Sequence, residues 1–314
     1  MTRDAAIAHA ADYFDSGAYR ADLTRRVAIR TESQMLADRG AEMAAYFAEM
    51  RATLEPMGYV CADYDNPVDG GGPFLIATRH EATDLPTVLT YGHGDVVRGL
   101  EEQWREGLDP WTVTVEDGDG AAARWYGRGT ADNKGQHSIN IGGLRAVLET
   151  RGGRLGFNSI ILIEMGEEIG SAGLQAFAES MADKLRADVL IASDGTRLSP
   201  ERPTLFMGSR GAFNFNLDLD LRVGAHHSGN WGGLISNPGV ILANAIACLV
   251  DGNGRIKVDA LRPQSLTNSV RMALADCTVE GGESGPEVEP EWGEPGLTPA
   301  ERVFGWNSFE VLAF

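Results

Sequence analysis

The pattern of hydrophobic and polar residues divides the chain into segments of different style. Residues 1 to about 60 carry Ala, Leu and Met three and four positions apart, most clearly in Gln34–Met57, and this spacing predicts helices. Beyond them, short apolar runs predict strands at Phe74–Ala77, Thr87–Tyr91, Ile160–Ile163 and Val189–Ala192, with helices at Gln136–Thr150 and Ala172–Arg186. Nearly continuous apolar strands that alternate with amphipathic helices indicate an α/β fold with a mixed, mostly parallel sheet flanked by helices.

The pattern changes after Pro203. Apolar and polar residues alternate strictly in Phe213–Leu221, which predicts a strand with one face in water. A helix is predicted at about Gly239–Val250, after Asn237 and Pro238. We therefore expect two domains, a first α/β domain at residues 1–207 and an inserted, smaller α+β domain at residues 208–314.

Composition and charge narrow the functional classes. The net charge is −18, from 45 acidic and 27 basic residues, which argues against nucleic acid or an anionic membrane as a partner. The three cysteines, an odd number at no metal-binding spacing, are typical of reduced thiols. The first residues lack the apolar core of a signal peptide, and no apolar run approaches the roughly 18 residues that span a bilayer. We expect a cytoplasmic protein.

Candidate metal ligands lie in four short acidic segments. Each segment follows an apolar run or lies in a glycine-rich turn, and the candidates are His93 and Asp95, Asp132, Glu167 and Glu168, and Asp194. In α/β sheets, ligands bind at the carboxyl ends of the strands, so these side chains are expected to share a cleft. One histidine with several carboxylates suits zinc, manganese or cobalt.

Two of these segments contain paired candidates, and each pair has two interpretations. His93 can bind a metal while Asp95 orients its ring, or the two residues form a surface turn. The side chains of Glu167 and Glu168 diverge at a strand end, so one carboxylate can bind metal while the other faces a metal-bound water. The alternative for this pair is a solvated helix start.

The glycine-rich segment Gly127–Gly135 does not match a nucleotide-binding loop. A dinucleotide fingerprint needs glycine where Asp132 stands, and a phosphate loop needs glycine before Lys134 and serine or threonine after it. The remaining interpretation is a tight loop that presents Asp132, whose two oxygens can bridge two cations.

The segment His226–Gly233 is either a histidine that reaches a ligand or a polar turn. The chain contains no His-Glu-x-x-His helix and no Gly-x-Ser-x-Gly turn, so single-zinc proteases and serine hydrolases lose support.

The four acidic segments, in this order and separation, resemble the di-zinc metallopeptidase family that includes carnosinases, aminoacylases, acetylornithine deacetylase and succinyl-diaminopimelate desuccinylase. The resemblance covers roughly residues 20–250. It implies two divalent ions, zinc with cobalt or manganese as alternatives, and a second domain that acts in dimerisation or as a lid. The implied roles are one metal on His93 and Asp194, the other on Glu168, Asp132 as the bridge, Asp95 orienting His93, Glu167 as general base, and His227 acting in a partner subunit of a homodimer. A cis peptide after Asp132 is also implied.

The chain departs from this family in one respect. Relatives carry a further histidine ligand in a C-terminal segment, whereas no histidine follows His227 here, so we expect a C-terminally truncated chain. The resemblance implies hydrolysis of an amide bond in a small peptide or N-acyl amino acid. The alternatives are another two-metal hydrolase, such as a phosphoesterase, and an inactive truncated homologue that only dimerises.

Overall fold

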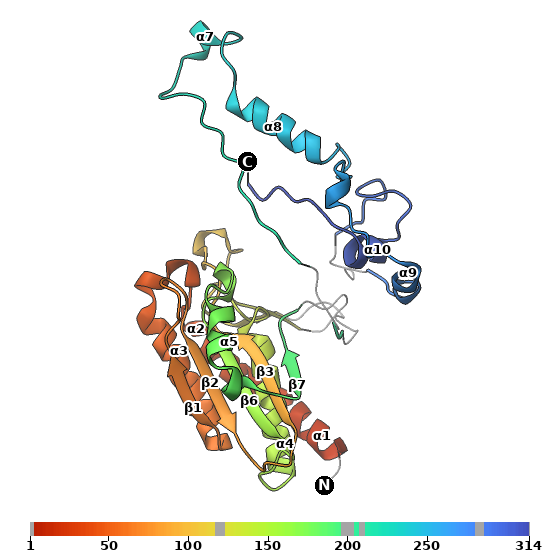
Figure 1. The fold of residues 1–314 in the computed structure, drawn as a ribbon. Helices are drawn as coiled ribbons and strands as arrows, with labels where there is room; N and C mark the ends of the chain where they lie inside the picture. Colours follow the sequence, from red (N-terminus) through yellow and green to blue (C-terminus); the bar gives the residue numbers. More distant parts are fainter. Residues whose placement is uncertain (1–2, 117–122, 196–203, 207–210, 280–285, 314) are drawn as a thin grey trace. The chain divides into compact units, whose positions relative to one another are not determined.

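A computed structural model describes residues 3–116, 123–195, 204–206, 211–279 and 286–313. The chain divides into two compact units, Met1–Gly195 and Thr196–Phe314, and each is described by itself (Figure 1). This division precedes the domain boundary expected from the sequence, and residue 208 itself lies outside the described ranges.

The first unit contains a five-stranded sheet with the strand order β1-β2-β6-β3-β7. Its strands are β1 (Val60–Tyr64), β2 (Phe74–Arg79), β3 (Thr87–His93), β6 (Asn158–Glu164) and β7 (Val189–Ala192). β3 pairs in parallel with β6 and β7, while β2 pairs antiparallel with β1 and β6. The mixed sheet flanked by helices confirms the predicted fold class, but two of the four pairings among the described strands of this sheet are antiparallel, so the sheet is not mostly parallel. The four predicted strands are β2, β3, β6 and β7.

Helices cover the sheet on both faces (Figure 1). The central strand β6 is buried along its whole length, and its alternate residues face opposite sides. Ile161 and Ile163 pack in one core cluster with residues of α3 (Gly40–Leu54) and α4 (Lys134–Thr150). On the other face, Phe74 of β2 stacks on Phe177 of α5 (Leu174–Ser180), with ring centroids 4.1 Å apart.

The described part of this unit contains nine further elements. They are α1 (Arg3–Asp15), α2 (Ala18–Ala28), η1 (Ser33–Asp38), η2 (Glu55–Met57), η3 (Glu101–Gln103), β4 (Thr114–Glu116), β5 (Arg124–Tyr126), η4 (Glu167–Ile169) and α6 (Ala182–Leu185). The helix expected at Ala172–Arg186 is therefore two helices, α5 and α6, which meet at Met181. β4 and β5 form a separate antiparallel hairpin.

In the described part of the second unit, the assigned elements are short helices. Its elements are α7 (Ser228–Trp231), α8 (Pro238–Leu249), η5 (Asp259–Leu261), α9 (Asn268–Leu274) and α10 (Pro299–Gly305). α8 confirms the predicted helix: the Asn237 side chain accepts a hydrogen bond from the backbone N–H of Val240, and Pro238 occupies the first turn. Across the described ranges, every helix is too short or too polar to cross a bilayer.

The strand predicted at Phe213–Leu221 is not observed. Its residues have no assigned strand pairing within the described part of the second unit. Alternating apolar and polar residues favour an extended backbone on a sheet with one face in water. A strand also needs a neighbouring strand to receive its hydrogen bonds. The pattern alone could not supply that neighbour.

Candidate metal centre

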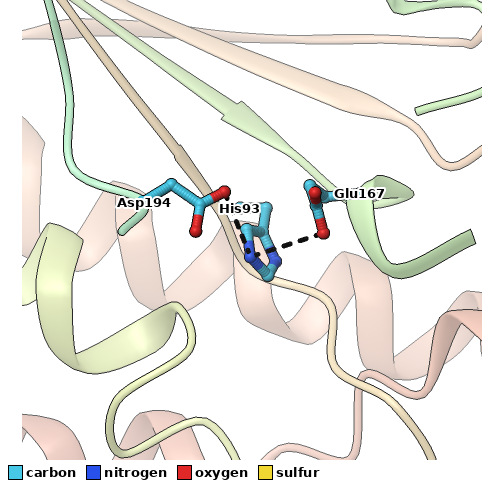
Figure 2. A group of neighbouring side chains, drawn as sticks. All are labelled: His93, Glu167 and Asp194. Carbon is cyan, nitrogen blue, oxygen red and sulfur yellow. Dashed lines mark ion pairs between the residues drawn. The ribbon is translucent and has the colours of Figure 1, made fainter. Parts of the chain in front are cut away.

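Three candidate ligands converge at the carboxyl ends of the parallel strands. His93 is the last residue of β3, Glu167 begins the turn after β6, and Asp194 follows β7. One ligand atom from each residue lies within 4.8 Å of the others. Figure 2 shows the three side chains directed toward one another, with Nε2 of His93 3.8 Å from a carboxylate oxygen of both Glu167 and Asp194. The parallel register of β3, β6 and β7 produces this convergence.

Asp132 joins the same histidine from the glycine-rich loop. Its Oδ1 lies 2.9 Å from Nε2 of His93, and its side chain is 65% exposed, which leaves access for a further ligand. The peptide bond between Asp132 and Asn133 is cis, which confirms that prediction. The loop is so compact that only glycine fits at position 135, since a Cβ there would stand only 1.8 Å from the carbonyl oxygen of Thr130.

Asp95 is fully buried and contacts both His93 and the turn that carries Glu167 and Glu168. Its Oδ1 lies 3.3 Å from Nδ1 of His93, as the orienting role requires. Its two carboxylate oxygens also accept hydrogen bonds from the backbone N–H groups of Glu167 and Glu168, at 3.2 and 3.1 Å. Asp95 therefore ties the end of β3 to the turn that carries the two glutamates.

Glu168 and His227 are not among the three residues of the converging group. Glu168 is half-buried beside Asp132, whose charge acts on it, but it is not one of the three residues whose ligand atoms lie within 4.8 Å. His227 lies in the second unit, where its Nδ1 accepts a hydrogen bond from the backbone N–H of Gly229 at the start of α7. The roles expected for these two residues, like those of His93, Asp95, Asp132, Glu167 and Asp194, stay predictions.

Comparison with known proteins assigns the chain to a family. The model of "Peptidase family M20/M25/M40" matches residues 89–303. The chain belongs to this peptidase family. The assignment confirms the resemblance drawn from the four acidic segments.

Among curated members of the M20/M25/M40 family, the chain is similar to the cysteinylglycine-S-conjugate dipeptidase of Corynebacterium striatum, with 31% identity over 67% of this chain and 44% of that protein. It is also similar to the Beta-Ala-His dipeptidase of Rattus norvegicus, with 32% identity over 61% of this chain and 38% of that protein. The chain thus spans less than half the length of these relatives. Among solved structures, human carnosine dipeptidase 1 matches with a TM-score of 0.67 and 25% identity, over 86% of this chain and 58% of that one.

Burial and neighbouring charges shift the pKa values of the carboxyl groups and of the imidazole in the site. Burial raises the pKa of Glu167 and of Asp194, and neighbouring carboxylates add to the effect although His93 opposes it. Burial and the charge of Asp132 raise the pKa of Glu168 to about 7. Burial disfavours the charged form of His93, but Asp95 and the other carboxylates outweigh it and raise its pKa to about 9.

These residues fit the divalent ions that the M20/M25/M40 family uses. An imidazole nitrogen and several carboxylate oxygens form a ligand set suited to zinc, cobalt or manganese. A cation would also offset the mutual repulsion that raises the carboxyl pKa values.

Sequence analysis missed the buried residues behind the ligands. Asn133 accepts a hydrogen bond from the backbone N–H of His93 and donates to the carbonyl oxygen of Ser193, next to Asp194. His137 contacts Asn133 from one turn further along α4. The four-residue spacing of Asn133 and His137 at a helix start was the available signal, because such residues lie on one helix face.

In the metal-free protein, the stabilising contributions of Glu168 and His93 are expected to be lost as the pH rises from about 5 to about 9. Folding raises the pKa of Glu168 from 4.5 to about 7 and that of His93 from 6.5 to about 9. A raised pKa means that the folded state holds its proton more tightly, so stability is greatest below the lower value and declines through the higher one. Zinc needs deprotonated ligands, so its stabilising effect should grow over the same range.

Thermal unfolding with a chelator and with zinc, at several pH values, measures both trends. A Glu168→Gln variant should decline less steeply without metal, because it lacks one of the two titrating groups. A Glu168→Gln variant whose metal-free melting temperature changes with pH in the same way as that of the unaltered chain would contradict the prediction.

Proposed function

We propose that the protein carrying this chain is a metal-dependent hydrolase that cleaves an amide bond in a dipeptide or an N-acyl amino acid. The convergence of His93, Glu167 and Asp194, with Asp132 on the same imidazole, carries this proposal. The two relatives are named as dipeptidases, which supports a small peptide as substrate.

We propose His93 and Asp194 as ligands of one metal, Glu168 as a ligand of a second, and Asp132 as the bridge between them. Zinc is the proposed metal, with cobalt or manganese as alternatives. When bound, such ions make hydroxide available near neutral pH and polarise a carbonyl group.

The chain's own residues would move the proton. Glu167, as general base, takes a proton from the attacking water and returns it to the leaving nitrogen. Its raised pKa supports this role, since a base works best with a pKa near the working pH. Asp95 keeps the imidazole of His93 and the backbone of Glu167 in place.

We also propose a cytoplasmic homodimer formed through the second unit, in which His227 stabilises the oxyanion in the partner's site. The exposed positions of Cys248 and Cys277 as free thiols fit a reducing compartment. Side chains such as Phe213 and Val240 are largely exposed in this unit and would suit an interface.

The test combines metal content with a substrate panel. The 314-residue chain, stripped by chelator and reloaded with zinc, cobalt or manganese, is assayed on Cys-Gly, β-Ala-His, N-acetyl amino acids and a phosphate monoester. Metal-dependent turnover of an amide supports the proposal. Turnover of the phosphate ester alone would replace it with a phosphoesterase, and a folded chain that neither binds metal nor turns over any substrate would favour the inactive homologue.

A further inference from the structure

A buried hydrogen-bonded triad of polar side chains, Tyr46, His137 and Asn133, lies behind the candidate ligands. All three are at most 3% exposed, and the proposed chemistry uses none of them. The hydroxyl of Tyr46 in α3 lies 2.5 Å from Nε2 of His137 in α4, and Nδ1 of His137 lies 3.1 Å from Oδ1 of Asn133. These contacts run from the helical layer toward the strand ends that carry the ligands.

Asn133 is the member of this triad that contacts the candidate metal site. Its Oδ1 accepts the backbone N–H of His93 at 3.2 Å, and its Nδ2 donates to the carbonyl oxygen of Ser193 at 2.5 Å and to Oε1 of Gln136 at 2.6 Å. One carboxamide thus holds the ends of β3 and β7, and with them two of the converging ligands.

The hydrogen-bond directions within the triad follow from the donor and acceptor atoms of its three side chains. Because a carboxamide oxygen can only accept, Nδ1 of His137 carries the proton and donates to Asn133. Nε2 of the neutral ring then accepts the proton of the Tyr46 hydroxyl. Burial keeps the pKa of His137 well below its ordinary value, which agrees with a neutral ring.

The triad packs closely against two glycines at the end of β3. A Cβ at Gly92 would stand 2.8 Å from Cβ of His137 and 2.9 Å from Oδ1 of Asn133. A Cβ at Gly94 would stand 2.3 Å from the ring of Tyr46. The residues on either side of His93 therefore lie directly against the three side chains, and little space is left for the carboxamide to rotate.

We propose that Tyr46 and His137 are positioning residues, which orient the Asn133 carboxamide and so set the separation of His93 and Asp194 for metal binding. The inference rests on the proposed function, because it takes these two residues as ligands. It adds a requirement in the helical layer, since loss of the Tyr46 hydroxyl leaves the buried Nε2 of His137 without its donor and loosens the orientation of the carboxamide.

Tyr46→Phe is the first test, because it removes the hydroxyl and keeps the ring that packs on Gly94. Residues that orient metal ligands typically change affinity by about 10–100-fold, so we expect zinc to bind the full chain about tenfold more weakly. Tyr59→Phe is the matched control: Tyr59 is 3% exposed, and its hydroxyl donates to Oγ of Ser159, at the start of β6, away from the ligand-bearing strand ends. Both variants should lower the unfolding midpoint of the metal-free protein to a similar extent, and only Tyr46→Phe should weaken zinc binding.

Three substitutions of His137 give a second test. Leucine should weaken zinc binding by about tenfold or more, because Asn133 loses its donor. Asparagine places an amide N–H near the position of Nδ1 and should restore most of the affinity. Glutamine places its amide near Nε2 instead, so it should restore less. Competition with a chromophoric chelator measures zinc affinity, and the visible spectrum of the cobalt-loaded chain reports the ligand geometry without any activity assay.

The outcomes separate this inference from the proposed function. Equal zinc affinity in Tyr46→Phe and Tyr59→Phe would overturn the positioning role and leave the metal centre intact. Equal affinity in the asparagine and leucine variants of His137 would also overturn it. Failure of the unaltered chain to bind any divalent ion would overturn both proposals. If the leucine variant does not fold, the tyrosine pair decides.

Discussion

Replacing Glu167 with glutamine is expected to lower amide turnover by about 10²–10⁴-fold while the bound metal stays in place. General acid–base catalysis contributes a factor of this size, and glutamine keeps the shape of the side chain but cannot accept the proton of water. Glu167 is half-buried and its pKa is raised, which suits a carboxylate that accepts a proton during the reaction. Turnover and metal content are measured on the same preparation.

The control for this prediction is Glu179→Gln, at an exposed position on α5 that pairs with Gln175. It should leave both readings unchanged. Metal loss in Glu167→Gln would make Glu167 a ligand, which its 3.8 Å approach to Nε2 of His93 permits. Near-normal turnover would show that Glu167 is not the base.

The sheet of the first unit could be predicted because four of its strands are nearly continuous apolar runs in the sequence. β6 is the clearest example: Ile160–Ile163 is continuously apolar, and the whole strand is buried. β1 escaped prediction because it is an edge strand whose residues are mostly half-exposed, so Val60–Tyr64 mixes apolar and polar residues without a clear period. The strand expected at Phe213–Leu221 failed for the opposite reason, since its pattern was clear but the described residues of its unit offer no partner strand.

The candidate site was predictable where strand ends locate it. His93, Glu167 and Asp194 follow apolar runs, and the parallel register brings them together. Backbone contacts were not predictable in this way: nothing in the sequence shows that the Asp95 carboxylate accepts from the N–H groups of Glu167 and Glu168. The triad of Tyr46, His137 and Asn133 joins two helices through side-chain hydrogen bonds. Because its members come from separate segments, no single segment of the sequence predicts it.

Replacing Asp132 with asparagine is expected to weaken metal binding at least about 100-fold and to lower the number of ions bound. The first part follows because a ligand should matter at least as much as the outer residues that orient ligands, which reach about 100-fold. The second part follows because asparagine has one oxygen instead of two: it can still accept a hydrogen bond from Nε2 of His93, but it cannot bridge two cations. At metal concentrations that saturate the unaltered protein, a 100-fold loss of affinity removes about 2.7 kcal/mol of metal-linked stability.

Calorimetric titration with zinc and thermal unfolding with and without metal measure these effects. Asp183→Asn is the control, because this aspartate is 97% exposed, lies on α6 and pairs only with Arg186 among the ion pairs of the described residues. The control should bind zinc as the unaltered chain does. If Asp132→Asn instead keeps two ions at unchanged affinity, the contact between Asp132 and His93 is a feature of the metal-free protein alone, and the bridge must be sought among the other carboxylates. If it keeps one ion at full affinity and loses the second, Asp132 serves only one metal, and His93 and Asp194 suffice to hold the other.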